Sequence, residues 1–366
     1  MAGKFAFKKF TDINLDDPFF DELKSDYPGN SYSTGFAEWF RKKARANATA
    51  LVFNDEDGLG AFVYLKSENE PIELTDQTLP ASPRIKIGTL RLAPRFRGQR
   101  LGEGAIGLAL WKWQSTKIDE IYVTVFEKHD VLINLFLRFG FSYIGDNLNG
   151  ERVYIKNRKT IDFRDPYKSF PFINPAFKKA GYLIVDDRYH DTLFPYSELK
   201  NTLQENVALA VANGLTKIYV GAQFTMPHYK AGEPVLIYRR HTGDGVKRYK
   251  SCITSFCLVS EVIMVKTNNR AHLSFDELLA RIGNKSVFDE QALKTKFDNE
   301  RNMVVIEMLY YGYFGEGNNV NMDWLDKNGY WSNDGSVYPT SIQLSPDQFK
   351  RILLEGNVDV SNVIID

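Results

Sequence analysis

The chain has 366 residues, 43% of them hydrophobic and 25% charged, a composition typical of folded proteins with a buried core that predicts two or three domains. Its 46 basic and 46 acidic residues cancel, and each half is nearly balanced: residues 1–160 hold 23 basic and 21 acidic residues, which leaves 23 and 25 for the rest. This balance argues against a protein that binds nucleic acid through an overall basic surface, but it leaves room for a local basic patch.

Membrane and metal functions receive no support from the sequence. No apolar run approaches the ~20 residues needed to cross a bilayer, and the N-terminal segment lacks the features of a signal peptide, so we expect a cytoplasmic protein without membrane association. Cys252 and Cys257 are the only cysteines, and they form neither a CxxC pair nor a cluster with histidines. We therefore expect reduced thiols in the core and no metal site.

The first 83 residues predict two helices and a hairpin. Residues 19–27 and 36–45 place apolar side chains at helical spacing. Residues 50–55 and 59–66 read as strands on either side of the turn Glu56-Asp57-Gly58, which is a strong hairpin signal. We expect the polar stretch 67–83 to be a loop.

The next segment has the element order of an α/β cofactor site. A strand over 84–92 ends before Pro94, and a glycine-rich turn leads into an apolar helix over 104–114. A strand over 120–126, a polar corner over 127–130 and a helix over 131–139 follow, with Gly140 at the end of that helix.

The glycine-rich turn has the features of a phosphate-binding loop. Backbone N–H groups at a helix N-terminus converge on one space, where the helix dipole favours an anion, and glycines allow a phosphate to approach closely. Gly98, Gly102 and Gly104 lie here together with Arg97 and Arg100. The spacing matches neither a P-loop nor a Rossmann fingerprint.

Residues 90–102 resemble motif A of the GNAT acetyltransferases, and residues 135–141 resemble the Leu-Tyr-x-x-x-Gly-Phe stretch of the same family. The resemblance covers about residues 1–157 and implies acetyl-CoA as the cofactor. It implies that the pantetheine arm and the acetyl carbonyl meet the backbone of the strand that contains Leu90 and Leu92. The residues expected to hold the cofactor are Leu90, Leu92, Arg97, Gly98, Gln99, Arg100, Leu101, Gly102, Glu103, Gly104 and Asn134.

Two residues depart from the family pattern. Arg100 replaces a loop glycine, and we expect it to preserve the N–H cradle only if its φ is negative. Phe136 replaces the tyrosine that in many members can protonate the departing thiolate. This substitution leaves Glu127 and His129 as candidate catalytic residues, with three alternatives: that this corner caps the helix, that His129 contacts the cofactor arm as the family's asparagine does, or that no dedicated base exists.

The second half predicts a separate domain. Residues 162–177 contain three prolines and little periodicity, so we expect domains at 1–160 and 178–366 joined by a linker over 161–177. The expected elements of the second domain are strands at 217–223, 233–240, 251–265 and 302–312 and helices near 197–212, 274–282 and 346–355.

Residues 230–240, 249–251 and 259–262 resemble the small β-barrels of the PUA-like and ASCH group. Such barrels often bind RNA, and cations and an aromatic side chain fall on one strand–loop–strand unit here. The alternative is a solvated hairpin tip. The candidate RNA-binding residues are Arg239, Arg240, Lys247, Arg248, Tyr249 and Lys250.

Together the two resemblances predict an α+β protein: a GNAT mixed sheet flanked by helices, followed by a second α+β domain built on a small PUA-like barrel. The combination indicates an acetyl-CoA-dependent N-acetyltransferase that acts on a primary amine. One hypothesis is a toxin-like enzyme whose acceptor amine is linked to RNA, as in aminoacyl-tRNA. The expected protein partner is an antitoxin or a second copy in a homodimer. The alternatives are a protein or small-molecule N-acetyltransferase and a non-catalytic acetyl-CoA sensor.

Overall fold

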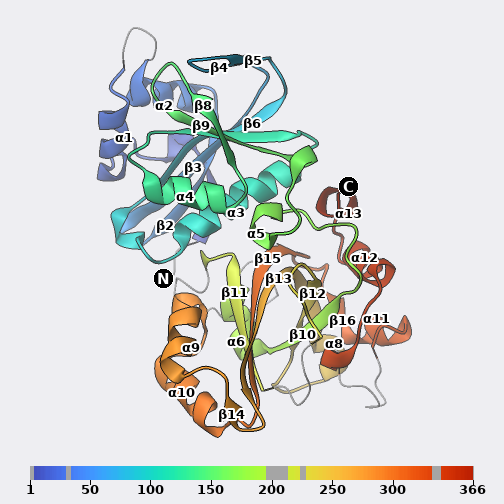
Figure 1. The fold of residues 1–366 in the computed structure, drawn as a ribbon. Coiled ribbons are helices and arrows are strands. Elements are labelled where there is room, and N and C mark those ends of the chain that lie inside the picture. The colour runs from blue at the N-terminus through green and yellow to red at the C-terminus, as the bar shows by residue number, and fades with distance from the viewer. Residues whose placement is uncertain (1–3, 30–33, 195–212, 223–227, 332–338, 366) are drawn as a thin grey trace. The chain divides into compact units, whose positions relative to one another are not determined.

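The computed structural model describes residues 4–29, 34–194, 213–222, 228–331 and 339–365. The chain divides into two compact units (Figure 1). The first unit contains residues 1–113, 118–136 and 141–158, and the second contains 114–117, 137–140 and 159–366. Among the residues that the structure describes, each helix is too short or too polar to cross a bilayer.

The first unit is built on a seven-stranded sheet in the order β1-β2-β3-β6-β7-β9-β8. Neighbouring strands are antiparallel except for β6 and β7, which are parallel. The strands are β1 (Lys4–Lys9), β2 (Thr49–Asp55), β3 (Gly58–Glu68), β6 (Arg84–Leu92), β7 (Glu120–Val125), β8 (Ser142–Asp146) and β9 (Arg152–Asn157).

Helices cover both faces of this sheet (Figure 1). The helices are α1 (Asp21–Asp26), α2 (Gly35–Arg45), α3 (Leu101–Gln114) and α4 (Asp130–Arg138). Phe20, just before α1, and Phe40 of α2 pack their rings against Phe62 of β3 on one face. On the other face, Gly102 of α3 lies against Leu92 of β6. These elements confirm the predicted helices and strands of this half to within a few residues.

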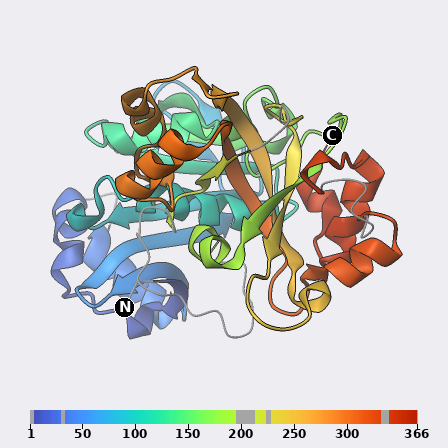
Figure 2. The same ribbon diagram turned by 90° about the horizontal axis from the view of Figure 1, so that it is seen from below.

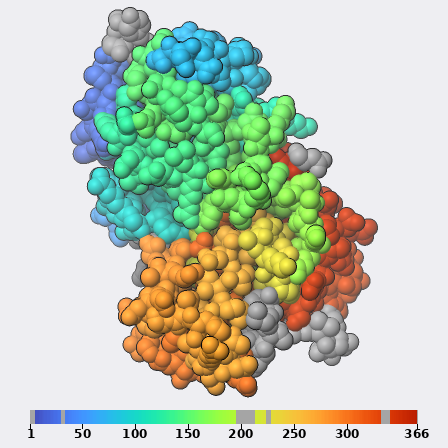
Figure 3. Space-filling view, in the orientation of Figure 1, coloured from blue at the N-terminus to red at the C-terminus, as the bar shows by residue number. Residues whose placement is uncertain are grey.

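The predicted hairpin is confirmed, because Asp55 pairs with Gly58 across the turn and Gly58 has a φ of 99°. The loop expected over residues 67–83 is partly wrong. It contains a small hairpin of β4 (Ile72–Glu73) and β5 (Thr78–Leu79), which is visible at the surface of this unit (Figure 3). Two-residue strands are too short to produce a periodic signal, so the sequence did not reveal them.

The second unit contains a mixed sheet in the order β10-β12-β13-β15-β11, with β14 and β16 also paired to β13. β10 and β12 are parallel and the other pairs are antiparallel. Register shifts interrupt the pairing of β13 with β15, as expected where a long strand curves. The strands are β10 (Gly181–Asp186), β11 (Thr216–Gly221), β12 (Pro234–Arg240), β13 (Cys252–Thr267), β14 (Arg270–Ala271), β15 (Met303–Tyr313) and β16 (Val320–Asn321).

Helices flank this second sheet on two sides (Figures 1 and 2). They are α9 (Phe275–Ile282) and α10 (Glu290–Asn299) on one side, and α11 (Met322–Lys327) and α12 (Pro346–Glu355) on the other. Leu278 of α9 and Leu293 of α10 belong to one buried cluster with Val305 of β15. The sequence predicted four strands and two helices here correctly. The helix expected near 197–212 and the last residue of the strand expected at 217–223 lie outside the described residues.

The stretch expected to be a linker belongs to the second unit. It contains the short helix α5 (Pro166–Ser169), and the side chains of Phe170, Phe172 and Ile173 are fully buried. Ser169 Oγ lies 2.9 Å from the Tyr311 hydroxyl, and the Ile173 N–H donates to the Val363 carbonyl at 2.8 Å. This stretch is therefore part of a core rather than an exposed tether. Three prolines without periodicity cannot distinguish these two situations.

Candidate functional site

The strands β6 and β7 diverge in the middle of the first sheet. They pair over only four residue pairs, from Arg84–Glu120 to Ile87–Val123, whereas β6 continues to Leu92 and stays paired with β3. Arg84, Ile85 and Ile87 are buried, but each residue from Gly88 to Leu92 is at least partly exposed. A central strand thus presents its backbone to an opening in the sheet.

The predicted phosphate loop lies directly after β6. A single 3-10 turn (Pro94–Phe96) leads to Gly98, whose φ is 75°, and α3 begins at Leu101. The N–H of Gly104 donates to the Arg100 carbonyl at 3.3 Å as the first turn of α3 forms. N–H groups at the start of an α-helix have no intrahelical acceptor, so the N-terminus of α3 can receive an anion.

Arg100 does not meet the condition of a negative φ that the sequence set for an intact N–H cradle. Its φ is 59°, in the left-handed region that the family's glycine would enter freely. The Arg100 side chain donates to Glu103 Oε2 from Nε at 3.0 Å and from Nη2 at 2.8 Å, and both side chains are close to nine-tenths buried. The ion pair holds the loop in a glycine-like conformation. Glu103, predicted to hold the cofactor, therefore contacts Arg100 in this structure.

Gly102 allows α3 to lie close to its neighbours. A Cβ atom at this position would lie 2.9 Å from Leu92 Cδ1 and 3.4 Å from Leu135 Cδ2. At Gly98 a Cβ atom would meet nothing within 4 Å. Gly102 therefore serves helix packing, and Gly98 is the loop glycine with open space beside it. Asn134 is exposed on α4.

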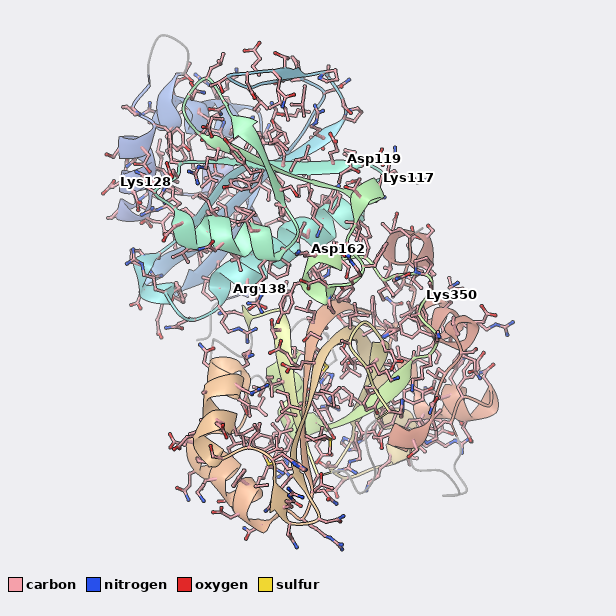
Figure 4. The ribbon with its side chains drawn as sticks, in the orientation of Figure 1. Lys117, Asp119, Lys128, Arg138, Asp162 and Lys350 are labelled. Carbon is pink, nitrogen blue, oxygen red and sulfur yellow. The ribbon has the colours of Figure 1, made fainter. Side chains whose placement is uncertain are left out.

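The corner after β7 separates the two candidate catalytic residues. The Glu127 side chain is 75% exposed and pairs with Arg152. His129 instead turns toward α1, where its Nε2 lies 3.6 Å from Asp26 Oδ2. Lys128 also pairs with Asp26 and lies beside α1 (Figure 4). The carbonyl of His129, the residue before α4, accepts from the Ile133 N–H at 3.0 Å, which supports the alternative that this corner caps the helix.

The structure shows an ion pair on the α1 face of β6 that the sequence did not indicate. Arg91 lies opposite Phe62 in the ladder, on the face away from Leu92, and pairs with Glu22 of α1. This hydrogen bond lowers the pKa of the Glu22 carboxyl below its ordinary value. Glu22, Asp26 and His129 all bring a polar atom within 4.8 Å of one another. The alternation along β6 places Arg91 on this face, but no local signal identifies Glu22 as its partner.

A second cluster centres on the buried carboxylate of Glu151, just before β9. Glu151 accepts hydrogen bonds from the Tyr27 hydroxyl at 2.7 Å, Thr124 Oγ1 at 3.2 Å and Asn147 Nδ2 at 2.9 Å. Burial and the charge of Glu151 raise the pKa of Tyr27 far above its ordinary value, so Tyr27 is a neutral phenol. Thr124 directly follows Val123, the last residue of β7 paired to β6. The cluster therefore borders the opening.

Phe136 is fully buried in α4 and its ring packs against Phe141, with 5.0 Å between the ring centroids. Its side chain carries no group that exchanges a proton. Gly140, two residues after α4 ends at Arg138, has a φ of 79°, as predicted for a residue that terminates this helix.

The basic residues of the second unit are largely paired with aspartates. Arg239 binds Asp191 through two hydrogen bonds, Nε to Oδ1 at 2.8 Å and Nη2 to Oδ2 at 2.9 Å. Arg240 pairs with Asp186 at 2.6 Å. Arg248 pairs with Asp323 at 2.6 Å and with Asp326 at 2.9 Å. The charges of all three predicted RNA-binding arginines are thus compensated.

The segment between β12 and β13 also differs from the predicted strand–loop–strand unit, because Lys247–Lys250 form a short helix, α8. Lys250 Nζ donates to the Asp244 carbonyl at 2.7 Å. Lys247 is exposed, and Tyr249 is 61% exposed. These two side chains remain available to a partner.

The two cysteines of this unit, Cys252 and Cys257, are buried free thiols, and burial raises the pKa of Cys252 to about 12.

Comparisons with known proteins identify the first unit. Residues 14–141 match the family described as "Acetyltransferase (GNAT) family". No curated protein was found to match the sequence. A GNAT-family acetyltransferase from Streptococcus agalactiae has a similar structure at 12% identity and a TM-score of 0.32, covering 43% of this chain and 96% of that chain.

Two further solved structures show similarity. A mutant of the AtaT toxin, bound to the C-terminus of the antitoxin AtaR and to acetyl-CoA, is 11% identical with a TM-score of 0.29, covering 43% of this chain and 94% of that one. An ASCH protein from Zymomonas mobilis is 10% identical with a TM-score of 0.31, covering 48% and 94%. The matched residues 14–141 hold β6, the glycine-rich loop, α3 and α4, and the N-terminal part of this chain is therefore a GNAT acetyltransferase domain.

Proposed function

We propose that this protein transfers the acetyl group of acetyl-CoA to a primary amine. The observation that carries the proposal is the opening between β6 and β7 beside the N-terminus of α3, within the segment that matches the GNAT family. Acetyl-CoA is the cosubstrate. A cofactor with a pyrophosphate and a long neutral arm suits an anion-accepting helix end next to an exposed strand backbone.

The chain's own residues account for donor binding and orientation. In this proposal the loop from Arg97 to Gly104 binds the pyrophosphate, and exposed Arg97 adds a positive charge. The backbone at Leu90 and Leu92 borders the opening and aligns the arm and the acetyl carbonyl. Fixing the thioester in this way lowers the entropic cost of attack by the amine, and donors aimed at the carbonyl oxygen stabilise its developing charge.

The amine acceptor is proposed in two forms. An RNA-linked amine, such as that of aminoacyl-tRNA, is supported by the resemblance of the second unit to RNA-binding barrels and by exposed Lys247 and Tyr249. A protein or small-molecule amine is supported by the aspartates that neutralise Arg239, Arg240 and Arg248. With an RNA-linked acceptor, the protein would act as a toxin that blocks translation, and an antitoxin would be its partner.

Radiolabelled acetyl-CoA incubated with the purified protein and a cell lysate tests the proposal. Label in RNA supports the first form, and label in protein or small molecules supports the second. Calorimetric binding of acetyl-CoA without any transfer would leave a non-catalytic sensor. Absence of binding by the folded protein would refute the whole proposal.

A further inference from the structure

The Tyr27–Glu151 pair lies where a reaction at the opening needs a proton acceptor. Thr124, which donates to Glu151, is the first residue of β7 beyond its pairing with β6. Arg91 on β6 reaches the same face of the sheet and pairs with Glu22 of α1. Tyr27 immediately follows α1, and its ring packs against Phe126 at 5.3 Å between centroids. Residues from α1, β6 and β7 thus surround one side of the opening.

Of the three carboxylates Glu22, Asp26 and Glu151 on this face, Glu151 is the one that forms no ion pair among the described residues. Glu22 pairs with Arg91, and Asp26 pairs with Lys128 and faces His129. Among the described residues, only neutral donors bond to the Glu151 side chain: a phenol, an alcohol and an amide. Glu151 is only 6% exposed, so water does not screen its charge fully. An approaching ammonium group would supply the missing positive charge.

Tyr27 is half-buried, and its hydroxyl is one of the three donors that bond to this carboxylate. Its proton is directed at Glu151 Oε1 at 2.7 Å, so its oxygen lone pairs remain for another donor. A phenol backed by a carboxylate can accept a proton on oxygen while it gives its own proton to the carboxylate. Phe136 provides no such group, so proton transfer falls to another residue or to solvent.

Building on the proposed function, we propose that Tyr27 is the catalytic residue that removes a proton from the acceptor ammonium and that Glu151 is the positioning residue that receives the Tyr27 proton. The neutral amine attacks the thioester carbonyl carbon, the C–N bond forms and the C–S bond breaks. The departing thiolate takes the second proton of the nitrogen, which leaves an amide and the CoA thiol. Glu151 then returns its proton to solvent through Tyr27.

Tyr27→Phe and Glu151→Gln remove this relay with little change in shape. Tyr143→Phe is the matched control, because its hydroxyl also donates to a carboxylate, that of Asp146 at 3.0 Å, on the exposed strand β8. Each full-length variant is tested for its melting temperature, its calorimetric affinity for acetyl-CoA and its rate of label transfer to the lysate fraction that wild type acetylates. We expect both relay variants to lose about 100-fold or more in kcat with unchanged acetyl-CoA affinity, and the control to match wild type.

A pH profile separates proton transfer from a structural role. Asp26 acts on the Tyr27 hydroxyl together with Glu151. Glu22, Lys128 and His129 lie beside Asp26, and Arg91 pairs with Glu22. Solvent deprotonates a larger fraction of the amine as pH rises, so the deficit of both variants should narrow toward high pH. A deficit in kcat that narrows in this way is the expected sign that the pair transfers a proton.

Three outcomes would overturn the assignment. Equal kcat in wild type, Tyr27→Phe and Glu151→Gln would exclude the relay. A deficit that is constant with pH would assign the pair a structural role. A loss of about 100-fold in kcat for His129→Gln, with Glu151→Gln at the wild-type rate, would move the base to His129. If wild type itself transfers no label, the proposed function fails, and that result is distinct from these three.

Discussion

Replacing Arg100 by glycine has two opposing effects on the free energy of unfolding: it relieves backbone strain and it breaks an ion pair. The variant removes the Cβ atom from a residue with a left-handed φ of 59°, which relieves about 1 kcal/mol of backbone strain. It also removes the cation from Glu103, whose side chain is only 8% exposed. Removing one member of a buried ion pair costs about 3 kcal/mol. We therefore expect Arg100→Gly to destabilise the first unit by about 2 kcal/mol.

Urea unfolding and thermal melts measure this difference, and in a unit of this size the melting temperature should fall by about 4–8 °C. Adding Glu103→Ala to Arg100→Gly should recover part of the loss, because no buried charge then remains. Arg41→Gln is the control: Arg41 and Glu38 have the same i,i+3 spacing at 3.7 Å but are exposed, so the change should cost less than about 0.5 kcal/mol. An Arg100→Gly protein as stable as wild type would refute the claim that the ion pair outweighs the strain.

Three other changes test the loop, the corner and the second unit. Gly102→Val places methyl groups against Leu92 and displaces α3, so it should weaken acetyl-CoA binding about tenfold or more. An unchanged calorimetric affinity in the folded variant would contradict this role of Gly102. His129→Asn should retain nearly full kcat if the corner only begins a helix, whereas a loss of about 100-fold would favour a base role. Burial opposes ionisation of Asp191, but hydrogen bonds from Arg239 and His190 outweigh it and lower the pKa to about 2. The free energy of unfolding, measured with urea, should therefore differ most between wild type and Arg239→Gln above about pH 4, and this difference should shrink as pH falls toward 2. A difference that stays constant over that range would contradict the pairing of Arg239 with Asp191.

Features determined by a few neighbouring residues could be predicted from the sequence. The turn at Gly58, the strand 84–92 ended by Pro94, the glycine-rich loop before α3 and Gly140 after α4 each depend on backbone preferences within about one turn of chain. The motif at residues 90–102 also led to the acetyltransferase family, because a phosphate loop is a local structure. Local chemistry was therefore sufficient to predict a cofactor loop and the acetyltransferase family.

The acceptor side depended on contacts between distant parts of the chain. Tyr27 and Glu151 are 124 residues apart, and Arg91 and Glu22 are 69 apart, so no periodicity or spacing connects them. The divergence of β6 from β7 is a property of the pairing of two strands, and the burial of Phe170 depends on the sheet that covers it. Residue types along the chain determined which groups are available, but only the tertiary structure decided which of them meet, because the energy of burial and of charge pairing depends on neighbours in space rather than in sequence.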